Sequence, residues 1–305
     1  MPYENFEGDL IRPIDGAVKD GDTLAMRSEI RLVGIDTPET KFSLKETRKF
    51  DNLISLSNQK IKTFLKNTSP SLRDYLKPKI ENNDGNIGTN QFEYGKQATQ
   101  EFSSIVKKIM THNATNLILM TSIEVTDRYG RLIGYVNRKK TEKTGEVLKE
   151  TLKFENSFNI RMLETGYAFM YLLYPNLVIE KKDKENISTT LTTLGLDIDD
   201  KTPDIEKPII KTIVKTFKKA ISSGKGLFPT KKSAEPKVVL DPFEFRYLGR
   251  IFDPTASSKG PDRFCADMVS GKLYPPDRYY EVPKENRLFY YKKYKKVALK
   301  KYELA

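Results

Sequence analysis

The chain has 305 residues, of which 53 are Lys or Arg and 41 are Asp or Glu, so its formal net charge is +12. That length allows one large domain or two ordinary ones, and the excess of positive charge favours a polyanionic partner such as nucleic acid. The single cysteine, Cys265, excludes an internal disulfide and a cysteine zinc cluster, and the single histidine, His112, excludes nuclease schemes that need a histidine pair.

The first 30 residues mix acids, bases and prolines and contain no signal-peptide core. We therefore expect a soluble, cytosolic protein as the sequence is written, or an exported one if a leader was removed ahead of Met1. No apolar run approaches the roughly 20 residues of a membrane span, so no membrane partner is expected. Residues 10–19 predict one weak strand, which Pro13 and a turn at Asp15-Gly16 interrupt.

Two short strands are predicted next, over Thr23 to Met26 and over Ile30 to Ile35, and we expect them to pair as a hairpin. This pairing would bring Asp22 and Asp36 to neighbouring ends of the hairpin. The plainer interpretation is that both acids only cap turns.

The residues around this hairpin carry the chemistry of a cation site beside a phosphate. Carboxylate oxygens of Asp22 and Asp36 suit Ca²⁺ or Mg²⁺. Arg31 on the return strand offers a planar fork that matches a phosphate. Glu39, just after a proline corner, is a spare carboxylate that can activate water.

Residues 41–93 are interpreted as an insertion. An apolar stripe at helical spacing predicts a helix that ends near Ser69-Pro70, and it consists of Phe50, Leu53, Ile54, Ile61, Phe64 and Leu65. The tract from Glu81 to Asn90 is polar and offers no packing surface. Because the insertion follows Glu39 directly, it is either a lid or rim of the site or a plain surface insertion.

The middle of the chain predicts an amphipathic helix over Tyr94 to Met110 and strands over Leu117 to Val125 and Arg131 to Asn137. The hairpin connection between these strands is Asp127-Arg128-Tyr129-Gly130. Arg131 follows it directly and would complete a phosphate clamp with Arg31.

Residues 138–155 are interpreted as a charged hairpin extension, and residues 180–207 as a second polar insertion. Between them, Asn156 is predicted to cap a helix that Gly166 ends, and an aromatic-rich stretch then runs to Tyr174. A strong amphipathic helix is predicted over Ile209 to Ile221.

The tail, residues 229–305, differs in composition, with 17 Lys or Arg against 10 Asp or Glu. Its stretch from Arg287 to Tyr302 contains seven basic residues, five aromatic residues and no acid. One interpretation is a solvated basic helix that packs through Tyr294, Val297 and Ala298. The other is a nucleic-acid contact, because cations and stacking rings together suit single strands. A contact with a protein partner is a third.

The wording and order of these motifs resemble the staphylococcal nuclease family. The resemblance covers roughly residues 14–228, with insertions at 41–93, 138–155 and 180–207. It rests on Asp-Gly-Asp-Thr at 20–23, Arg-Leu-Val-Gly-Ile-Asp-Thr-Pro-Glu-Thr at 31–40 and Asp-Arg-Tyr-Gly-Arg at 127–131. Tyr94-Gly95, Asn159 and Gly166 follow in family order. The resemblance implies an α+β fold, a five-stranded OB-type barrel with three packed helices in residues 1–228, and a C-terminal extension of unknown role at 229–305.

The resemblance also implies roles for particular residues. Asp22 and Asp36 match carboxylate ligands of Ca²⁺, and Thr37 matches a ligand through its backbone carbonyl. Glu39 matches the residue that orients or deprotonates the attacking water, and Arg31 and Arg131 match the arginines that hold the phosphate.

The implied reaction is calcium-dependent, sugar-nonspecific hydrolysis of DNA or RNA that leaves 3′-phosphate ends. Family members stack a nucleotide on tyrosines after the glycine turn, for which Tyr171 and Tyr174 are the candidates, although Leu172 occupies one of the expected places. The alternative is a nucleic-acid-binding module of the same fold that has lost the chemistry.

Overall fold

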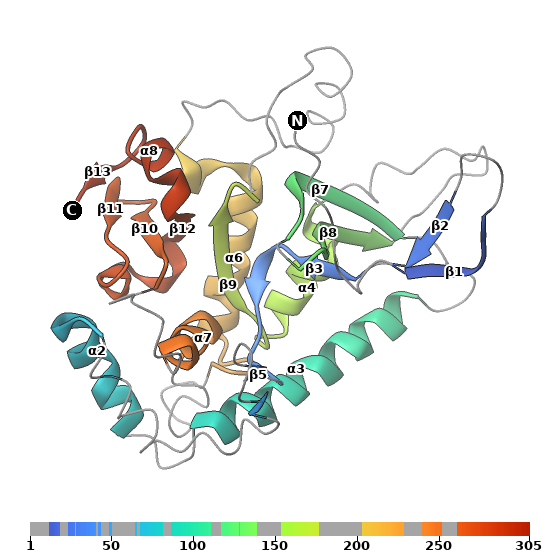
Figure 1. Ribbon diagram of the computed structural model, residues 1–305, viewed down its shortest axis with the longest axis horizontal. Helices are drawn as coiled ribbons and strands as arrows, with labels where there is room; N and C mark the ends of the chain where they lie inside the picture. The colour runs from blue at the N-terminus through green and yellow to red at the C-terminus, as the bar shows by residue number, and fades with distance from the viewer. Residues whose placement is uncertain are drawn as a thin grey trace.

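A computed structural model describes most of the chain and shows it as an α+β protein (Figure 1). The described residues are 12–18, 24–27, 29–40, 42–43, 49–50, 65, 68–81, 87–110, 117–127, 129–138, 154–176, 203–228, 240–251 and 261–305. Within these ranges no helix is long and apolar enough to cross a membrane.

The largest sheet has six strands in the order β13-β11-β10-β12-β9-β4. Their bounds are β4 Gly34–Asp36, β9 Phe169–Tyr174, β10 Arg263–Asp267, β11 Lys272–Tyr274, β12 Arg287–Tyr291 and β13 Glu303–Leu304. β9 pairs antiparallel with β4 on one side and parallel with β12 on the other. One sheet therefore continues across residue 228, so the C-terminal extension is built onto the nuclease-like part of the chain.

A second sheet has the order β3-β8-β7, with bounds β3 Ile30–Leu32, β7 Leu117–Thr126 and β8 Leu132–Arg138. Two-stranded sheets join β1 Arg12–Val18 to β2 Leu24–Arg27, and β5 Phe42–Ser43 to β6 Lys49–Phe50. The expected pairing of the two strands around residue 28 is wrong, because β2 pairs with β1 and β3 pairs with β8. Gly34, with φ of 77°, is the first residue of β4. At this point the chain stops pairing with β8, through β3, and starts pairing with β9, through β4.

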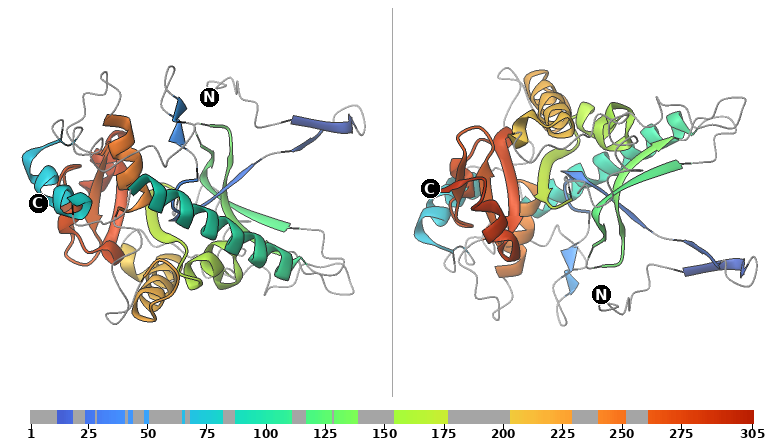
Figure 2. Two further views of the ribbon diagram at one scale, coloured as in Figure 1. Left: turned by 90° about the horizontal axis from the view of Figure 1, so that it is seen from below. Right: turned by 90° about the horizontal axis from the view of Figure 1, so that it is seen from above.

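The α+β class is confirmed, but the described strands do not close into one barrel, and the five-stranded barrel is not confirmed. The helices are α2 Pro70–Glu81, α3 Ile87–Ile109, α4 Phe158–Glu164, α6 Pro208–Ser222, α7 Pro242–Ile251 and α8 Lys295–Ala298. Short 3-10 helices span η3 Phe154–Asn156, η4 Asp204–Glu206, η5 Tyr279–Glu281, η6 Lys284–Asn286 and η7 Lys292–Tyr294. Seen from below, α3 crosses in front of the strands (Figure 2).

The insertion at 41–93 differs from its prediction. Phe50 lies in strand β6, and α2 begins at Pro70, where a helix was expected to end. The rest of the predicted stripe lies outside the described residues, apart from the buried Leu65. Helix α3 begins at Ile87 rather than at Tyr94, because Ile87 is buried and gives the polar tract a packing surface after all.

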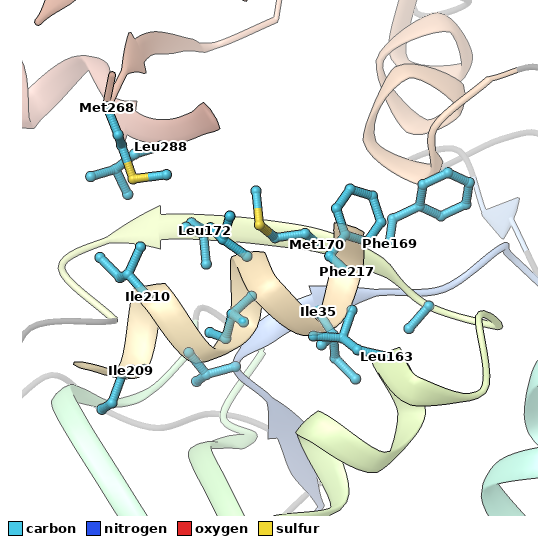
Figure 3. Packing of buried hydrophobic residues seen from close by; sticks show 14 of the residues in the cluster. Ile35, Leu163, Phe169, Met170, Leu172, Ile209, Ile210, Phe217, Met268 and Leu288 are labelled. Atoms are coloured by element: carbon cyan, nitrogen blue, oxygen red, sulfur yellow. The ribbon is translucent and has the colours of Figure 1, made fainter. Parts of the chain in front are cut away.

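The main core gathers around β9. Its neighbours are α4, β4 and α6, whose apolar face buries Ile210, Ile213 and Phe217. Met268 and Leu288 of the C-terminal extension approach Leu172 of β9 in the same cluster (Figure 3). The predicted capping residue of α4 is off by one, since the side chain of Ser157 accepts the hydrogen bond from the Ile160 N–H.

A second core joins the insertion to the extension. Leu72, Leu76 and Ile80 of α2 belong to the same buried cluster as Phe243 and Phe245 of α7. Of the interpretations of the stretch from Arg287, the basic helix is wrong at its start, because residues 287–291 form the strand β12 between β10 and β9. A strand covered on both faces requires a continuous apolar run, which Leu288, Phe289 and Tyr290 provide.

Candidate active site

Asp36 is the last residue of β4 and pairs with Phe169, the first residue of β9. Its carboxylate is almost fully buried, with 2% of the residue exposed. The Nη2 of Arg31 donates to its Oδ1 at 2.8 Å and to the carbonyl of Ile35 at 3.4 Å. A buried carboxylate needs such a partner, because an unpaired charge in the interior costs several kcal/mol, on the order of 3–5.

Glu39 is held close to Asp36 by the helix α3. A Cβ at Gly95 would lie 2.8 Å from the carbonyl oxygens of both Pro38 and Glu39, so only glycine lets the helix approach this corner. The Glu39 N–H also donates to the Oε1 of Gln91 at 3.3 Å, and the Nε2 of Gln91 donates to the carbonyl of Leu240 at 2.8 Å. The buried Gln91 therefore links the Glu39 corner to Leu240, just ahead of α7.

Arg246 of α7 reaches the same two carboxylates from the C-terminal extension. Its Nη2 lies 2.5 Å from Oδ2 of Asp36, and its Nη1 lies 3.1 Å from Oδ1 of Asp36 and 2.5 Å from Oε1 of Glu39. This is a two-pronged contact with one carboxylate and a bridge to a second. The guanidinium lies where a cation shared by the two acids would lie, so it stands in for such a cation.

The charges of the cluster oppose the effect of burial on its acids. Burial alone would raise the pKa of Asp36, but the charges of Arg246 and Arg31 outweigh it and hold that pKa below its usual value. Burial raises the pKa of Glu39 above its usual value, against the charge of Arg246 and with a contribution from Asp36. The two carboxyls thus differ in basicity, and Glu39 is the better proton acceptor.

The predicted site residues are brought together only in part. Arg31, Asp36 and Glu39 gather at one place, and Thr37 lies between the two acids in the chain. Asp22 lies outside the described residues.

Arg131 follows the predicted hairpin, which is confirmed, and its guanidinium pairs with Asp127 through contacts of 2.6 and 2.7 Å. Its neighbour Leu132 pairs with Ile30, so Arg131 directly precedes the strand beside the one that carries Arg31. Its predicted role in binding phosphate stays a prediction.

The two predicted stacking tyrosines are covered by the C-terminal extension. The ring of Tyr171 is stacked on Phe243 at 5.8 Å and tilted against Phe289 at 5.4 Å. Tyr174 is stacked on Tyr290 at 4.9 Å. A nucleobase would have to displace the rings that enclose the buried Tyr171, whereas Tyr174 is partly exposed. The substrate-binding role of both tyrosines stays a prediction.

A hard cation is compatible with the chemistry of these donors. Asp36 presents both carboxylate oxygens to a positive group, and the backbone carbonyl of Thr37 adjoins it in the chain. Across the described part of the chain, no three acids, histidines or cysteines form a ready metal cluster. The residue types fit Ca²⁺, while both oxygens of Asp36 are engaged by Arg246.

Arg246 and Gln91 belong to the site but are not among the residues predicted from sequence. Arg246 had a local signal, because Asp-Pro-Phe-Glu at 241–244 combines a capping-box spacing with proline at the first helical position. The structure contains one half of that box, with the Asp241 N–H donating to the Oε2 of Glu244 at 2.9 Å, while the Asp241 carboxylate accepts from Lys284 and Arg287. Gln91 had no such signal, since its contacts depend on an insertion and a tail folding together.

Fold and site together define an α+β protein in which buried carboxylates and arginines converge on one point, a constellation suited to a phosphate and a cation. Comparison with known families agrees, since a family model described as staphylococcal nuclease homologue matches residues 29–190, more than half of the chain. The chain belongs to the staphylococcal nuclease family. Its members are generally nucleases, so the match indicates a nuclease or a nucleic-acid-binding protein. No curated protein was found to match the chain.

Proposed function

We propose that the chain is a calcium-dependent, sugar-nonspecific nuclease that hydrolyses phosphodiester bonds of DNA or RNA and leaves 3′-phosphate ends. The observation that carries the proposal is the meeting of Arg31 and Glu39 at the buried carboxylate of Asp36. A family domain that has lost its chemistry is expected to lack one or more of these groups. Membership of a family of nucleases supports the same conclusion.

Each group has a role that its chemistry supports. Asp36 and the carbonyl of Thr37, with Asp22, would hold the calcium ion, which when bound supplies positive charge next to the phosphate. Glu39 accepts a proton from the attacking water, a task for which its raised pKa suits it. Arg31 binds a phosphate oxygen and offsets charge that develops there. Arg131 acts likewise after exchanging Asp127 for the phosphate.

A digestion assay tests this proposal. We expect the purified chain to cleave single-stranded DNA and RNA oligonucleotides with Ca²⁺ and to stop when a chelator is added. Glu39→Gln should reduce the rate by about a hundredfold or more, because a positioned base contributes at least that much. Glu281→Gln, which removes one acid of an exposed ion pair with Arg278, is the matched control and should cleave normally. Full activity in Glu39→Gln, or cleavage that ignores the chelator, would refute the assignment.

A second candidate is a nucleic-acid-binding module without catalysis. It is favoured by one observation, namely that Arg246 already neutralises both acids while the extension covers Tyr171 and Tyr174. The two candidates separate in one experiment. Retardation of an oligonucleotide that stays intact after long incubation with Ca²⁺ supports the binding module.

A further inference from the structure

We propose that Arg246 is the internal counter-cation of the nuclease carboxylates, and that a divalent cation reaches Asp36 only by displacing the Arg246 guanidinium. The inference rests on the proposed assignment of Asp36 as a cation ligand. It adds to the site a residue from the C-terminal extension, outside the matched residues 29–190.

The first argument is geometric. Arg246 engages both oxygens of Asp36 and one oxygen of Glu39 at 2.5 to 3.1 Å. A carboxylate whose Oδ1 also accepts from Arg31 has few lone pairs left for an ion. A calcium ion binds oxygen at about 2.3–2.6 Å, within the space that the guanidinium holds. Both cations therefore cannot contact Asp36 in this way at once.

The second argument concerns charge. Counted over its described members, the cluster of Arg31, Arg246, Asp36 and Glu39 is neutral, with two positive and two negative groups. A divalent ion added to this neutral cluster meets no net attraction from it. With Arg246 withdrawn, the remaining groups carry one net negative charge and attract the ion.

Helix α7 is anchored by its buried residues, while the Arg246 side chain on it has room to move. Phe245, Tyr247 and Leu248 around it are buried, whereas Arg246 keeps 26% of its side chain exposed. Glu244 on the same helix is fully buried and accepts from the hydroxyl of Tyr279 at 2.8 Å. The backbone thus stays in place and only the long side chain has to swing toward solvent, where a phosphate of the substrate offers it a new partner.

The test is direct cation binding to the full chain without nucleic acid, by calorimetric titration with Ca²⁺. Arg246→Gln should bind Ca²⁺ about tenfold tighter or more, since losing one competing charge pair is worth about 1.4 kcal/mol or more. Arg246→Lys keeps the charge but loses the fork, and its affinity should fall between the two. Arg278→Gln removes an exposed arginine paired with Glu281 and should bind like the unaltered chain.

An affinity in Arg246→Gln that equals or falls below that of the unaltered chain, at an unchanged melting temperature, would overturn the inference. If Arg246→Gln does not fold, the unaltered chain decides the matter. A crystal structure with Mn²⁺ bound should show the guanidinium away from Asp36, and one in which ion and guanidinium both contact Asp36 would overturn it.

These outcomes separate this inference from the proposed function. Tighter cation binding by Arg246→Gln in a chain that cleaves nothing would overturn the nuclease assignment alone. Calcium-dependent cleavage with equal affinity in the two chains would overturn only the role of Arg246.

Discussion

The close approach of α3 to the Glu39 corner makes Gly95→Ala a sharp test of how the site is positioned. The added Cβ would lie 2.8 Å from two carbonyl oxygens, and ordinary contact begins near 3.4 Å, so the helix and the corner must separate by about 0.6 Å. Alanine improves helix propensity by about 1 kcal/mol, while overpacking of this kind costs about 1–3 kcal/mol. We therefore expect a small net change in stability, at most about 2 kcal/mol of destabilisation.

Activity should fall far more than stability. A displacement of about 1 Å costs on the order of a hundredfold in rate, so about 0.6 Å at Glu39 should cost roughly tenfold in kcat. Cleavage of a fluorescent oligonucleotide and urea unfolding measure the two quantities on the same preparation. Gly271→Ala is the control for a loss of stability without displacement of the site, because it adds a Cβ in open space between β10 and β11 at a backbone φ of 72°; it should lose about 1 kcal/mol of stability and keep its activity. Full activity in Gly95→Ala with normal stability would show that Glu39 does not depend on this contact.

Three further predictions concern the structure that supports the site. Asn159→Ala should lower the free energy of unfolding by about 2–4 kcal/mol, because the carbonyl of Val33 and the N–H of Val136 lose buried hydrogen bonds; a loss below about 1 kcal/mol in urea unfolding would contradict this. Burial would raise the pKa of Asp241, but the charges of Lys284 and Arg287 hold it below the ordinary 3.8. The ion pairs of Asp241 therefore stabilise the fold above the ordinary pKa of 3.8, and this stabilisation is lost as the pH falls through the lowered pKa. Asp241→Asn should accordingly cost about 3–5 kcal/mol at neutral pH and progressively less in acid. If urea unfolding shows that Asp241→Asn loses the same free energy of unfolding at every pH, down to the lowest at which the chain is folded, the ion-pair account is refuted. Burial raises the pKa of the Cys265 thiol to about 12, so a thiol reagent at mildly alkaline pH should label it only in denaturant, and labelling of the native chain would contradict its placement in β10.

The part of the site that could be predicted from sequence is the part made by neighbours in the chain. Arg31, Asp36 and Glu39 lie within nine residues of each other, so a strand and a proline corner are enough to bring them together. From the sequence, Gly95 stands out only as part of a family motif. The structure shows why glycine is needed there, because the helix contacts the backbone of Pro38 and Glu39. Local geometry brings the residues of one motif together, which a sequence pattern records, whereas the contact of Gly95 joins segments that lie far apart in the chain.

The rest depended on pairings that no local pattern encodes. The sequence leaves the stretch from Arg287 open between an exposed basic helix and a nucleic-acid contact, yet the apolar side chains of residues 287–291 fill a strand beside β9. The pairing of β3 with β8 rather than β2 likewise depends on a partner about a hundred residues away. Tertiary burial overrides local propensity in both cases.

The C-terminal extension contacts the site at Tyr171 and at Asp36, and these contacts affect how a substrate can bind. Tyr171 is 8% exposed and its ring is enclosed by Phe243 and Phe289, which are themselves buried. To expose that ring, the core around it would have to open, together with the parallel pairing of β12 with β9. The loss of so much apolar contact costs far more than the roughly 1–3 kcal/mol gained from stacking one base. The arginine fork of Arg246, in contrast, can leave Asp36 by rotation of one side chain. If the proposed function holds, we therefore expect a substrate to bind through its phosphate and the arginines, without base preference, because phosphate contacts position a strand without reading its sequence.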